Sequence, residues 1–302
     1  MEYISATKDF QLNNTIVTIG KFDCFHKGHQ LLFHIASSMK KPGTMQVIFS
    51  FAENPSDVVN NTPRRHIVAA NEREYQAVKN GADIFVEYPF DEETRNMTPD
   101  EFAKEVLKNR LGAAAVVAGD DFRFGKDRAG DCDTLRNLGK LYGFEVRIVD
   151  RICYKGQYIS STYIRNELVK GNLKDVSEML GRPFTMAGVI SHGQHIGSRM
   201  GIPTINFSVP SDKLLPPDGV YATVTHIGEH YLKSITNIGV RPTFYKDGER
   251  SVETNILDFE GDIYGSKAVV GFHSFIRPEM KFQGADELTA QIRQDMDAVR
   301  AY

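Results

Sequence analysis

The chain has 302 residues, of which 41% are hydrophobic and 25% charged, as is typical of a globular protein with one large or two ordinary domains. Its net charge of -3 provides no general attraction to nucleic acid or to an anionic membrane, and no apolar run is long enough for a membrane span. No secretory signal is visible, and the three widely spaced cysteines match neither a disulfide framework nor a zinc cluster, so we expect a cytoplasmic protein.

Short apolar segments alternate with helical patterns in the first half of the chain. One helix is predicted after the capping box Thr98-Pro99-Asp100-Glu101, and another ends at Gly143. The segments between helices are almost wholly apolar, as in strands buried on both faces. The expected strands are 15–19, 45–51, 84–88, 114–118 and 145–149. This alternation predicts an α/β domain with a parallel sheet, whose ligands bind beyond the carboxyl ends of the strands.

The pattern changes near residue 182. A helix starting at 160–162 and a short helical piece through 176–180 lead to Gly181-Arg182-Pro183. Beyond this point short strands alternate with Gly, Pro and Asp turns until a helix at 285–299. We therefore predict two domains, 1–182 and 183–302, the second a small antiparallel β-barrel with one C-terminal helix.

The first candidate site follows the expected strand 15–19. His26 and His29 bracket Gly28 where the strand turns into a helix. Imidazoles and the backbone N–H groups of a helix N-terminus can bind one phosphate together, and a glycine lets that phosphate approach the backbone. A packing role for a single histidine is the ordinary alternative, but the pair favours nucleotide chemistry with transfer at phosphorus.

Several segments carry a resemblance to known enzymes. The His-x-Gly-His pattern resembles the signature of nucleotidylyltransferases, and the segments 119–125 and 159–165 resemble bacterial FAD synthetases, the bifunctional riboflavin kinase/FMN adenylyltransferases. The glycine-rich stretch 197–207, with its Pro-Thr-x-Asn pattern, is similar to riboflavin kinases, and the segments 217–222, 237–244 and 251–258 extend that similarity.

The resemblance implies two activities. The C-terminal domain would phosphorylate riboflavin to FMN with Mg-ATP, and the N-terminal domain would transfer AMP from ATP to FMN, giving FAD and pyrophosphate. Riboflavin, FMN and ATP would be the partners, without nucleic acid or membrane, and the oligomeric state is left open. The implied catalytic residues are Glu253, His26 and His29, and the implied Mg²⁺ ligands are Thr204 and Asn206.

Binding residues are implied in the same way. Those for ATP and its phosphates are Gly20, Phe22, Asp23, Gly28, Ser160, Ser161, Thr162, Arg165, Gly197 and Gly201. Those for the flavin are Asn54, Asp121, Phe122, Phe124, Arg277 and Phe282.

Three positions depart from the family pattern. Cys24 stands where glycine is usual, Asn54 where histidine is common, and Ser198 where bacterial members carry an arginine. One alternative is therefore a flavokinase with an impaired adenylyltransferase domain, and another is a non-catalytic regulator that binds flavin or nucleotide. The His-x-Gly-His pattern also resembles class I tRNA synthetases, but the negative net charge disfavours an RNA-linked enzyme.

Overall fold

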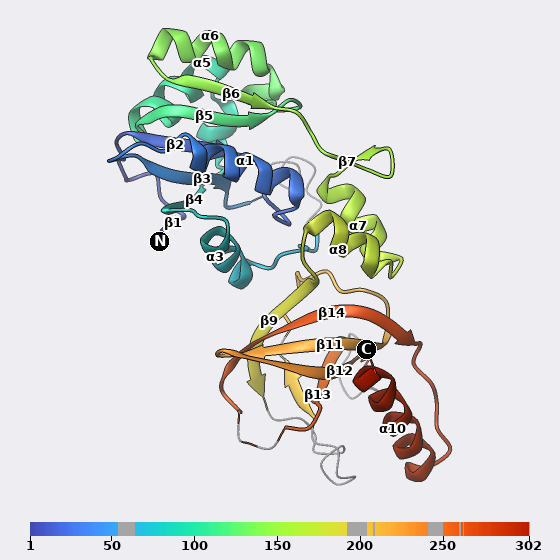
Figure 1. Ribbon diagram of the computed structural model, residues 1–302. Coiled ribbons are helices and arrows are strands. Elements are labelled where there is room, and N and C mark those ends of the chain that lie inside the picture. The colour runs from blue at the N-terminus through green and yellow to red at the C-terminus, as the bar shows by residue number, and fades with distance from the viewer. Residues whose placement is uncertain are drawn as a thin grey trace. The chain divides into compact units, whose positions relative to one another are not determined.

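The computed structural model describes residues 1–53, 64–191, 204–207, 209–240, 250–259, 261 and 263–301. They form two compact units, residues 1–64 with 70–160, and residues 65–69 with 161–302 (Figure 1). Each helix in the described ranges is too short or too polar to cross a bilayer.

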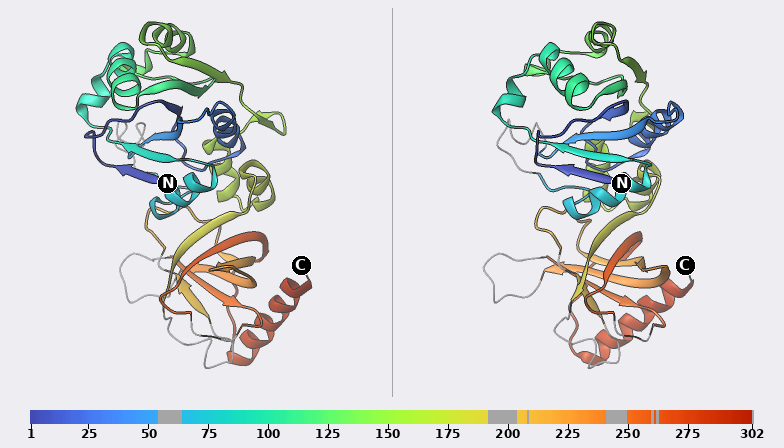
Figure 2. Two further views of the ribbon diagram at one scale, coloured as in Figure 1. Left: turned by 60° about the vertical axis from the view of Figure 1, so that its left-hand side comes forward. Right: turned by 90° about the vertical axis from the view of Figure 1, so that its left-hand side faces the viewer.

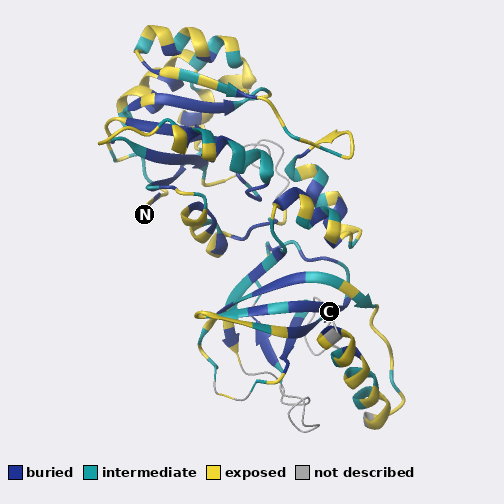
Figure 3. Cartoon of the chain, in the orientation of Figure 1, coloured by how far each residue is buried: buried dark blue, intermediate teal, exposed yellow. Residues whose placement is uncertain are grey.

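The first unit is built on a six-stranded parallel sheet. Its strands are β1 (Glu2–Ser5), β2 (Thr15–Ile19), β3 (Met45–Phe51), β4 (Ile84–Tyr88), β5 (Ala113–Gly119) and β6 (Glu145–Val149). Their order is β1-β4-β3-β2-β5-β6. Strands β2 and β4 are buried along their whole length (Figure 3), as expected for strands covered on both faces. The predicted parallel sheet is confirmed, with β1 as an additional edge strand.

Helices connect these strands. They are α1 (Lys27–Ser38), α3 (Ala70–Lys79), α4 (Glu92–Asn96), α5 (Pro99–Glu101) and α6 (Cys132–Tyr142). The capping box of Thr98 and Glu101 starts α5, which continues as the π-helical segment η1 (Phe102–Arg110). A short 3₁₀ turn, η2 (Lys126–Arg128), and a two-stranded hairpin, β7 (Cys153–Tyr154) with β8 (Gln157–Tyr158), complete the unit.

Opposite faces of the sheet carry different helices. One face packs Val17, Phe49 and Val116 against Phe102 and Val106 of η1. On the other face, the buried Gln46 side chain donates to the carbonyl of Phe33 in α1 at 3.2 Å. The sheet is therefore sandwiched between two helical layers, as the near-continuous apolar strands require.

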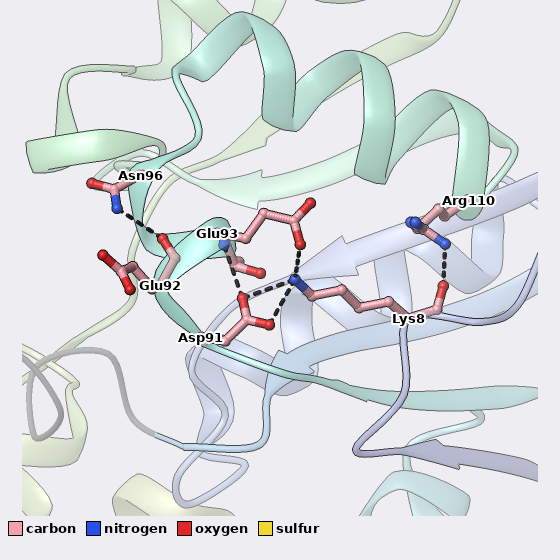
Figure 4. A network of polar contacts seen from close by, with 7 residues as sticks. Lys8, Asp91, Glu92, Glu93, Asn96 and Arg110 are labelled. Atoms are coloured by element: carbon pink, nitrogen blue, oxygen red, sulfur yellow. Dashed lines mark hydrogen bonds and ion pairs between the residues drawn. The ribbon is translucent and has the colours of Figure 1, made fainter.

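A polar network fixes the segment between β1 and β2 (Figure 4). The Lys8 ammonium lies 2.8 Å from carboxylate oxygens of both Asp91 and Glu93, and Arg110 donates to the Lys8 carbonyl. Asp91 also caps α4 by accepting from the Thr94 N–H at 2.9 Å. These hydrogen bonds hold the pKa of Asp91 down, to about 2. The network thus joins the segment after β1 to the start of α4 and the end of η1.

In its described residues, the second unit is a closed barrel with three helices. Helices α7 (Ser161–Val169) and α8 (Leu173–Leu180) precede it, and α10 (Ala285–Ala301) follows it. Its strands are β9 (Phe184–Ser191), β10 (Ile205–Phe207), β11 (Gly219–Ile227), β12 (His230–Val240), β13 (Arg250–Ile256) and β14 (Lys267–Arg277). The strand order is β10-β13-β12-β11-β14-β9, and β9 pairs with β10 to close it. The predicted barrel with a C-terminal helix is confirmed.

Buried hydroxyl groups fill part of the barrel interior. Val220, Ala222 and Ile235 pack outward with Val299 of α10, which lies along the outside of the barrel (Figure 2), so the alternate residues face inward. Five of these inward residues are almost fully buried and joined by hydrogen bonds of 2.8–2.9 Å. They are Thr223, Thr225, Ser234, Thr236 and Thr254. These hydroxyl groups hydrogen-bond to one another, so no charged side chain is needed as their partner.

The two compact units divide at residues 160 and 161, so α7 and α8 pack with the barrel rather than with the sheet. Segment 65–69 also joins this unit, because the buried Lys213 ammonium donates to the carbonyls of Ile67 and Thr185, each at 2.8 Å. Our boundary at residues 182/183 concerns the limits of the functional domains and stays a prediction.

Candidate active sites

The first candidate site lies where the strand order reverses. The chain proceeds from β2 toward β3 and β4 on one side, whereas β5 and β6 lie on the other side of β2. The loops after β2 and β5 therefore leave the same edge of the sheet from neighbouring strands. This switch point is the usual ligand position in an open parallel sheet. It brings together the predicted residues of segments 20–29 and 119–124.

The loop after β2 is tightly constrained by buried aromatic rings. Phe22 and Phe25 are fully buried, and their backbones adopt left-handed φ angles of +34° and +51°. Such angles are strained for bulky residues and occur mainly where the surrounding packing enforces them. The Phe22 ring lies 4.9 Å from the rings of both Phe33 and His29. A Cβ on Gly20 would approach the Phe22 ring to 2.7 Å, so glycine is required there.

The two histidines form a stacked pair at the start of α1. His26 is the N-cap residue, and its Nδ1 accepts from the His29 N–H at 3.2 Å. The two imidazole centroids are 3.6 Å apart with nearly parallel planes. A Cβ on Gly28 would lie 3.0 Å from the His26 ring, so this glycine admits the imidazole itself. From the sequence alone, the same space is expected to admit a phosphate.

Burial keeps both imidazoles neutral near pH 7. It lowers the pKa of His26 to about 4, and it lowers the pKa of His29 well below its usual value, with the neighbouring His26 acting in the same direction. Because Nδ1 of His26 accepts a hydrogen bond, its proton resides on Nε2. The pair therefore offers neutral N–H donors, rather than positive charges, to a ligand.

Ser50 and Arg73 hold the start of the same loop. Ser50 Oγ donates to the Lys21 carbonyl at 3.3 Å, and Arg73 Nη2 donates to Ser50 Oγ at 3.0 Å. Arg73 Nη1 pairs with the buried Glu87 of β4, to which Tyr3 also donates. This chain of contacts is not predictable from the sequence, because its members come from β1, β3, α3 and β4 and share no local motif.

The loop after β5 contains the predicted flavin contacts. Arg151 pairs with Asp120 at 2.7 Å and with Asp121 at 3.5 Å. Phe122 and Phe124 stack with centroids 5.4 Å apart. Phe124 is buried in the core, while Phe122 stays partly exposed. Of the two rings, Phe122 is therefore the one that a planar ligand can reach.

The remaining nucleotide residues lie elsewhere in the structure. Asp23 is partly buried next to the histidines, and its charge acts on His26. Ser160 ends the first compact unit, whereas Ser161, Thr162 and Arg165 belong to the second. There the Arg165 guanidinium donates to the Arg65 carbonyl. Asn54, Gly197 and Gly201 lie outside the described residues.

The second candidate site is a row of side chains across the barrel. Glu253 of β13 is the direct partner of Asn206 in β10 and of Asn237 in β12. Ile235, which shares its face with Asn237, packs toward α10, so the row lies on the outer face. Thr204 precedes Asn206 by two residues. From β9 to β14, the row reads Ser191, Asn206, Glu253, Asn237, Val220 and Arg277.

A second carboxylate, that of Glu279, lies over this row. The Asn237 side chain donates to Glu279 Oε1 at 3.5 Å, and a Cβ on Gly239 would come within 1.9 Å of the same oxygen. Asn237 and Glu279 were not among the predicted site residues. A signal was present for Asn237, which lies in the family-like segment 237–244, and Glu279 follows the predicted Arg277 by two residues, but neither stretch alone shows that the two side chains meet.

Arg277 at the end of the row is held by α10. Its guanidinium makes two hydrogen bonds from Nε to Asp295, at 2.9 and 3.1 Å, and Nη2 lies 2.7 Å from the same carboxylate. Asp295 is 3% exposed and also accepts from Gln291. The Phe282 ring lies 5.8 Å from the guanidinium. Arg277 and Phe282 thus adjoin each other as expected, but the charge of Arg277 is already paired.

Comparisons with known proteins match both units. A family model for FAD synthetase matches residues 8–163, and one for riboflavin kinase matches residues 180–302. The bifunctional riboflavin kinase/FMN adenylyltransferases of Pseudomonas fluorescens and Listeria monocytogenes are both 33% identical to the chain. The alignments cover 95% and 96% of this chain and 92% of each relative.

One solved structure is similar to the chain over its full length. It is named as a macrolide-efflux protein from Streptococcus pneumoniae, with a TM-score of 0.88, 31% sequence identity and full coverage of both chains. From its full-length relatives and the two matching family models, we conclude that the chain belongs to the family of bifunctional riboflavin kinase/FMN adenylyltransferases.

Proposed function

We propose that this chain makes FAD from riboflavin in two steps, each in one of the two domains. The C-terminal domain phosphorylates riboflavin to FMN, and the N-terminal domain adenylylates FMN to FAD; both consume ATP. The observation that carries the proposal is that both site constellations are assembled on their matching folds, the histidine pair at the sheet edge and the Asn206–Glu253 row on the barrel. Because ATP and flavins are intracellular metabolites, we expect the enzyme to act in the cytoplasm.

In the kinase step we assign the base to Glu253. Its carboxylate takes the proton from the 5′-hydroxyl of riboflavin as that oxygen attacks the γ-phosphorus of ATP, and the P–O bond to ADP breaks. Asn237 is the direct neighbour of Glu253 on β12, and its own amide is oriented by a hydrogen bond to Glu279. Phe282 provides an aromatic surface for the isoalloxazine ring.

The donors in the row suit Mg²⁺. Thr204 contributes a hydroxyl, Asn206 an amide oxygen and Glu253 a carboxylate, and all three are hard oxygen ligands. We assign Thr204 and Asn206 to hold the cation. When bound with ATP, the ion supplies charge neutralisation at the phosphates.

In the adenylylation step, positioning and hydrogen bonding carry the catalysis. An FMN phosphate oxygen attacks the α-phosphorus of ATP, pyrophosphate leaves, and no protein nucleophile is needed. The Nε2–H of His26 and an N–H of His29 donate to the oxygens that gain charge, together with backbone N–H groups at the start of α1. From the resemblance we also assign Ser160, Ser161, Thr162 and Arg165 as donors for the triphosphate, and Asp121 and Phe122 as flavin contacts, with the buried Phe124 ring supporting Phe122.

The decisive experiment follows each step separately. The full chain is incubated with riboflavin, ATP and Mg²⁺, and in parallel with FMN, ATP and Mg²⁺, and the products are separated by chromatography. FMN and FAD in the first mixture and FAD in the second support both assignments. FMN without FAD identifies a flavokinase with an inactive adenylyltransferase domain, and flavin binding without ATP consumption identifies a regulator.

A further inference from the structure

Three potential metal ligands meet at the histidine pair. Cys24, His26 and His29 each offer one donor atom, and these atoms all lie within 4.8 Å of one another. Cys24 is fully buried, His26 is 6% exposed and His29 is partly exposed, so the group is largely buried but can be reached through His29. The three residues come from one short segment, the strained loop and the first turn of α1.

The donors fit a particular class of cation. One thiolate and two imidazoles form a borderline-soft set that favours Zn²⁺ or a similar transition metal over Mg²⁺. In a tetrahedral zinc site with Zn–S and Zn–N bonds of normal length, donor atoms lie roughly 3.3–3.6 Å apart. The three donor atoms must therefore move closer to one another by at most about 1.5 Å to reach these separations. Side-chain rotation can supply movements of that size.

A second observation points to a ligand at the same place. The Nδ1 atom of His29 is buried, and within the described residues it has no hydrogen-bond partner. A buried polar atom without a partner is costly, and such atoms in native proteins commonly face a ligand, an ion or a water. His29 thus carries a donor atom that a cation would satisfy.

We propose that Cys24, His26 and His29 form an inhibitory site for a zinc-type cation, whose binding withdraws both imidazoles from the nucleotide. Three protein ligands leave a fourth position for water, and the thiol proton of Cys24 is released to solvent on binding. The inhibitory consequence rests on the proposed adenylyltransferase function, whereas the metal site itself does not.

Binding through His26 competes with the helix cap. Its Nδ1 accepts from the His29 N–H, so a cation at Nδ1 replaces that hydrogen bond, and a cation at Nε2 moves the ring proton to Nδ1 and breaks it as well. We therefore expect zinc to loosen the first turn of α1 while it occupies the site. This provides a structural readout, amide exchange in residues 27–30, that is independent of activity.

Metal binding is tested first without substrates. The full chain is titrated with CoCl₂, whose bound form has visible bands and a thiolate charge-transfer band, and with ZnCl₂ in competition with a chromophoric chelator. We expect one strong site in the wild type and roughly tenfold or greater weakening in Cys24→Ser. Cys132→Ser and Cys153→Ser, which remove the two cysteines outside the cluster, are matched controls and should bind like the wild type.

Activity is measured second, as the ratio of rates with and without stoichiometric ZnCl₂ for each variant. Zinc should suppress FAD formation from FMN in the wild type and in both control variants, spare riboflavin phosphorylation, and lose this effect in Cys24→Ser. If circular dichroism shows that Cys24→Ser is unfolded, Cys24→Ala is measured in the same way.

The outcomes separate the two proposals. Undiminished zinc affinity in the Cys24 variant, or absence of the thiolate–cobalt band in the wild type, overturns the metal site. Cys24-dependent metal binding in a protein that never forms FAD leaves the site standing and refutes the adenylyltransferase assignment. FAD formation that zinc suppresses equally with and without Cys24 refutes the inhibitory role.

Discussion

Asn206 and Glu253 are direct partners across strands β10 and β13, so an amide and a carboxylate project side by side from one face of the barrel. Because the pair lies within the hydrogen-bonded ladder, its spacing is set by the backbone and does not depend on a loop. This placement is what a metal-binding residue and a base need if one is to hold the phosphate-bound cation and the other is to deprotonate the attacking hydroxyl.

Replacing Glu253 with Gln should abolish the kinase step alone. The amide cannot accept the hydroxyl proton, and we expect kcat for FMN formation to fall by about 10²- to 10⁴-fold. Adenylylation of supplied FMN should be unchanged, because it uses the other domain. Glu229→Gln, in the exposed turn before β12 of the same barrel, is the control and should retain both activities. A folded Glu253→Gln protein that lost both activities would contradict two independent sites.

Replacing His29 with Ala should have the opposite effect. It removes one donor at the α-phosphate, and the expected loss of FAD formation is roughly 10²- to 10³-fold. Riboflavin phosphorylation by the same protein should continue at the normal rate. His34→Ala alters an exposed histidine on the same helix and serves as control. Comparable losses of FAD formation in His29→Ala and His34→Ala would show that the effect comes from a disturbed helix α1 and not from the loss of the His29 imidazole.

The buried histidines should make the first unit sensitive to acid. A pKa of about 4 for folded His26 lies below the ordinary value, so between about pH 4 and 6.5 the unfolded chain binds more protons and stability falls as the pH falls. The loss from His26 is roughly 2 kcal/mol at pH 5. His29, with its pKa shifted in the same direction, adds to it.

His26→Asn tests this sensitivity while preserving a good N-cap residue. Urea unfolding at pH 7 and pH 5, followed by circular dichroism, should show a smaller loss of stability on acidification than in the wild type. His34→Asn, the matched change on the exposed side of α1, should leave the wild-type pH dependence in place. An identical pH dependence in His26→Asn would mean that the His26 imidazole is not kept neutral by burial.

Breaking the Arg277–Asp295 pair should detach α10. Asp295→Asn leaves a largely buried guanidinium without its counter-ion, at a cost of about 3 kcal/mol. Hydrogen exchange should then quicken throughout α10 and along β14. The exposed Asp297 lies two residues after Asp295, on roughly the opposite side of α10, and is bonded to Arg300; it gives the control Asp297→Asn, which should exchange like the wild type. Unaltered exchange in Asp295→Asn would show that the other contacts of α10, among them Val299 and the Arg300–Asp258 pair, hold the helix without this ion pair.

Local patterns were sufficient to predict most of the fold. The strand expected at 15–19 has those bounds as β2, and the helix expected at 285–299 ends two residues later as α10. Strand β1 was missed because four residues at a sheet edge carry too little periodicity. The π-helical hydrogen bonds of η1 could not be predicted either, because the spacing of its apolar residues resembles that of an ordinary α-helix.

The sites were less predictable, since they depend on register between distant strands. Motifs identified Asn206 and Glu253 separately, but no local pattern aligns residues 47 positions apart in sequence into one row. The ion pair of Arg277 could not be predicted for the same reason, because its partner Asp295 lies on the separate helix α10. Phe22 was predicted to bind nucleotide, yet its buried ring supports His29, a role that only packing reveals.

The two units differ in how they expose backbone hydrogen-bonding groups. The barrel closes on itself, whereas the parallel sheet ends at β1 on one side and β6 on the other. Open edges are where strands of separate molecules add to one another during aggregation. Strand β1 has only four residues, and β6 carries Glu145 and Arg147, which discourage such addition. If the protein self-associates on heating, the contact should form through the sheet, and further charges on β6 should delay precipitation.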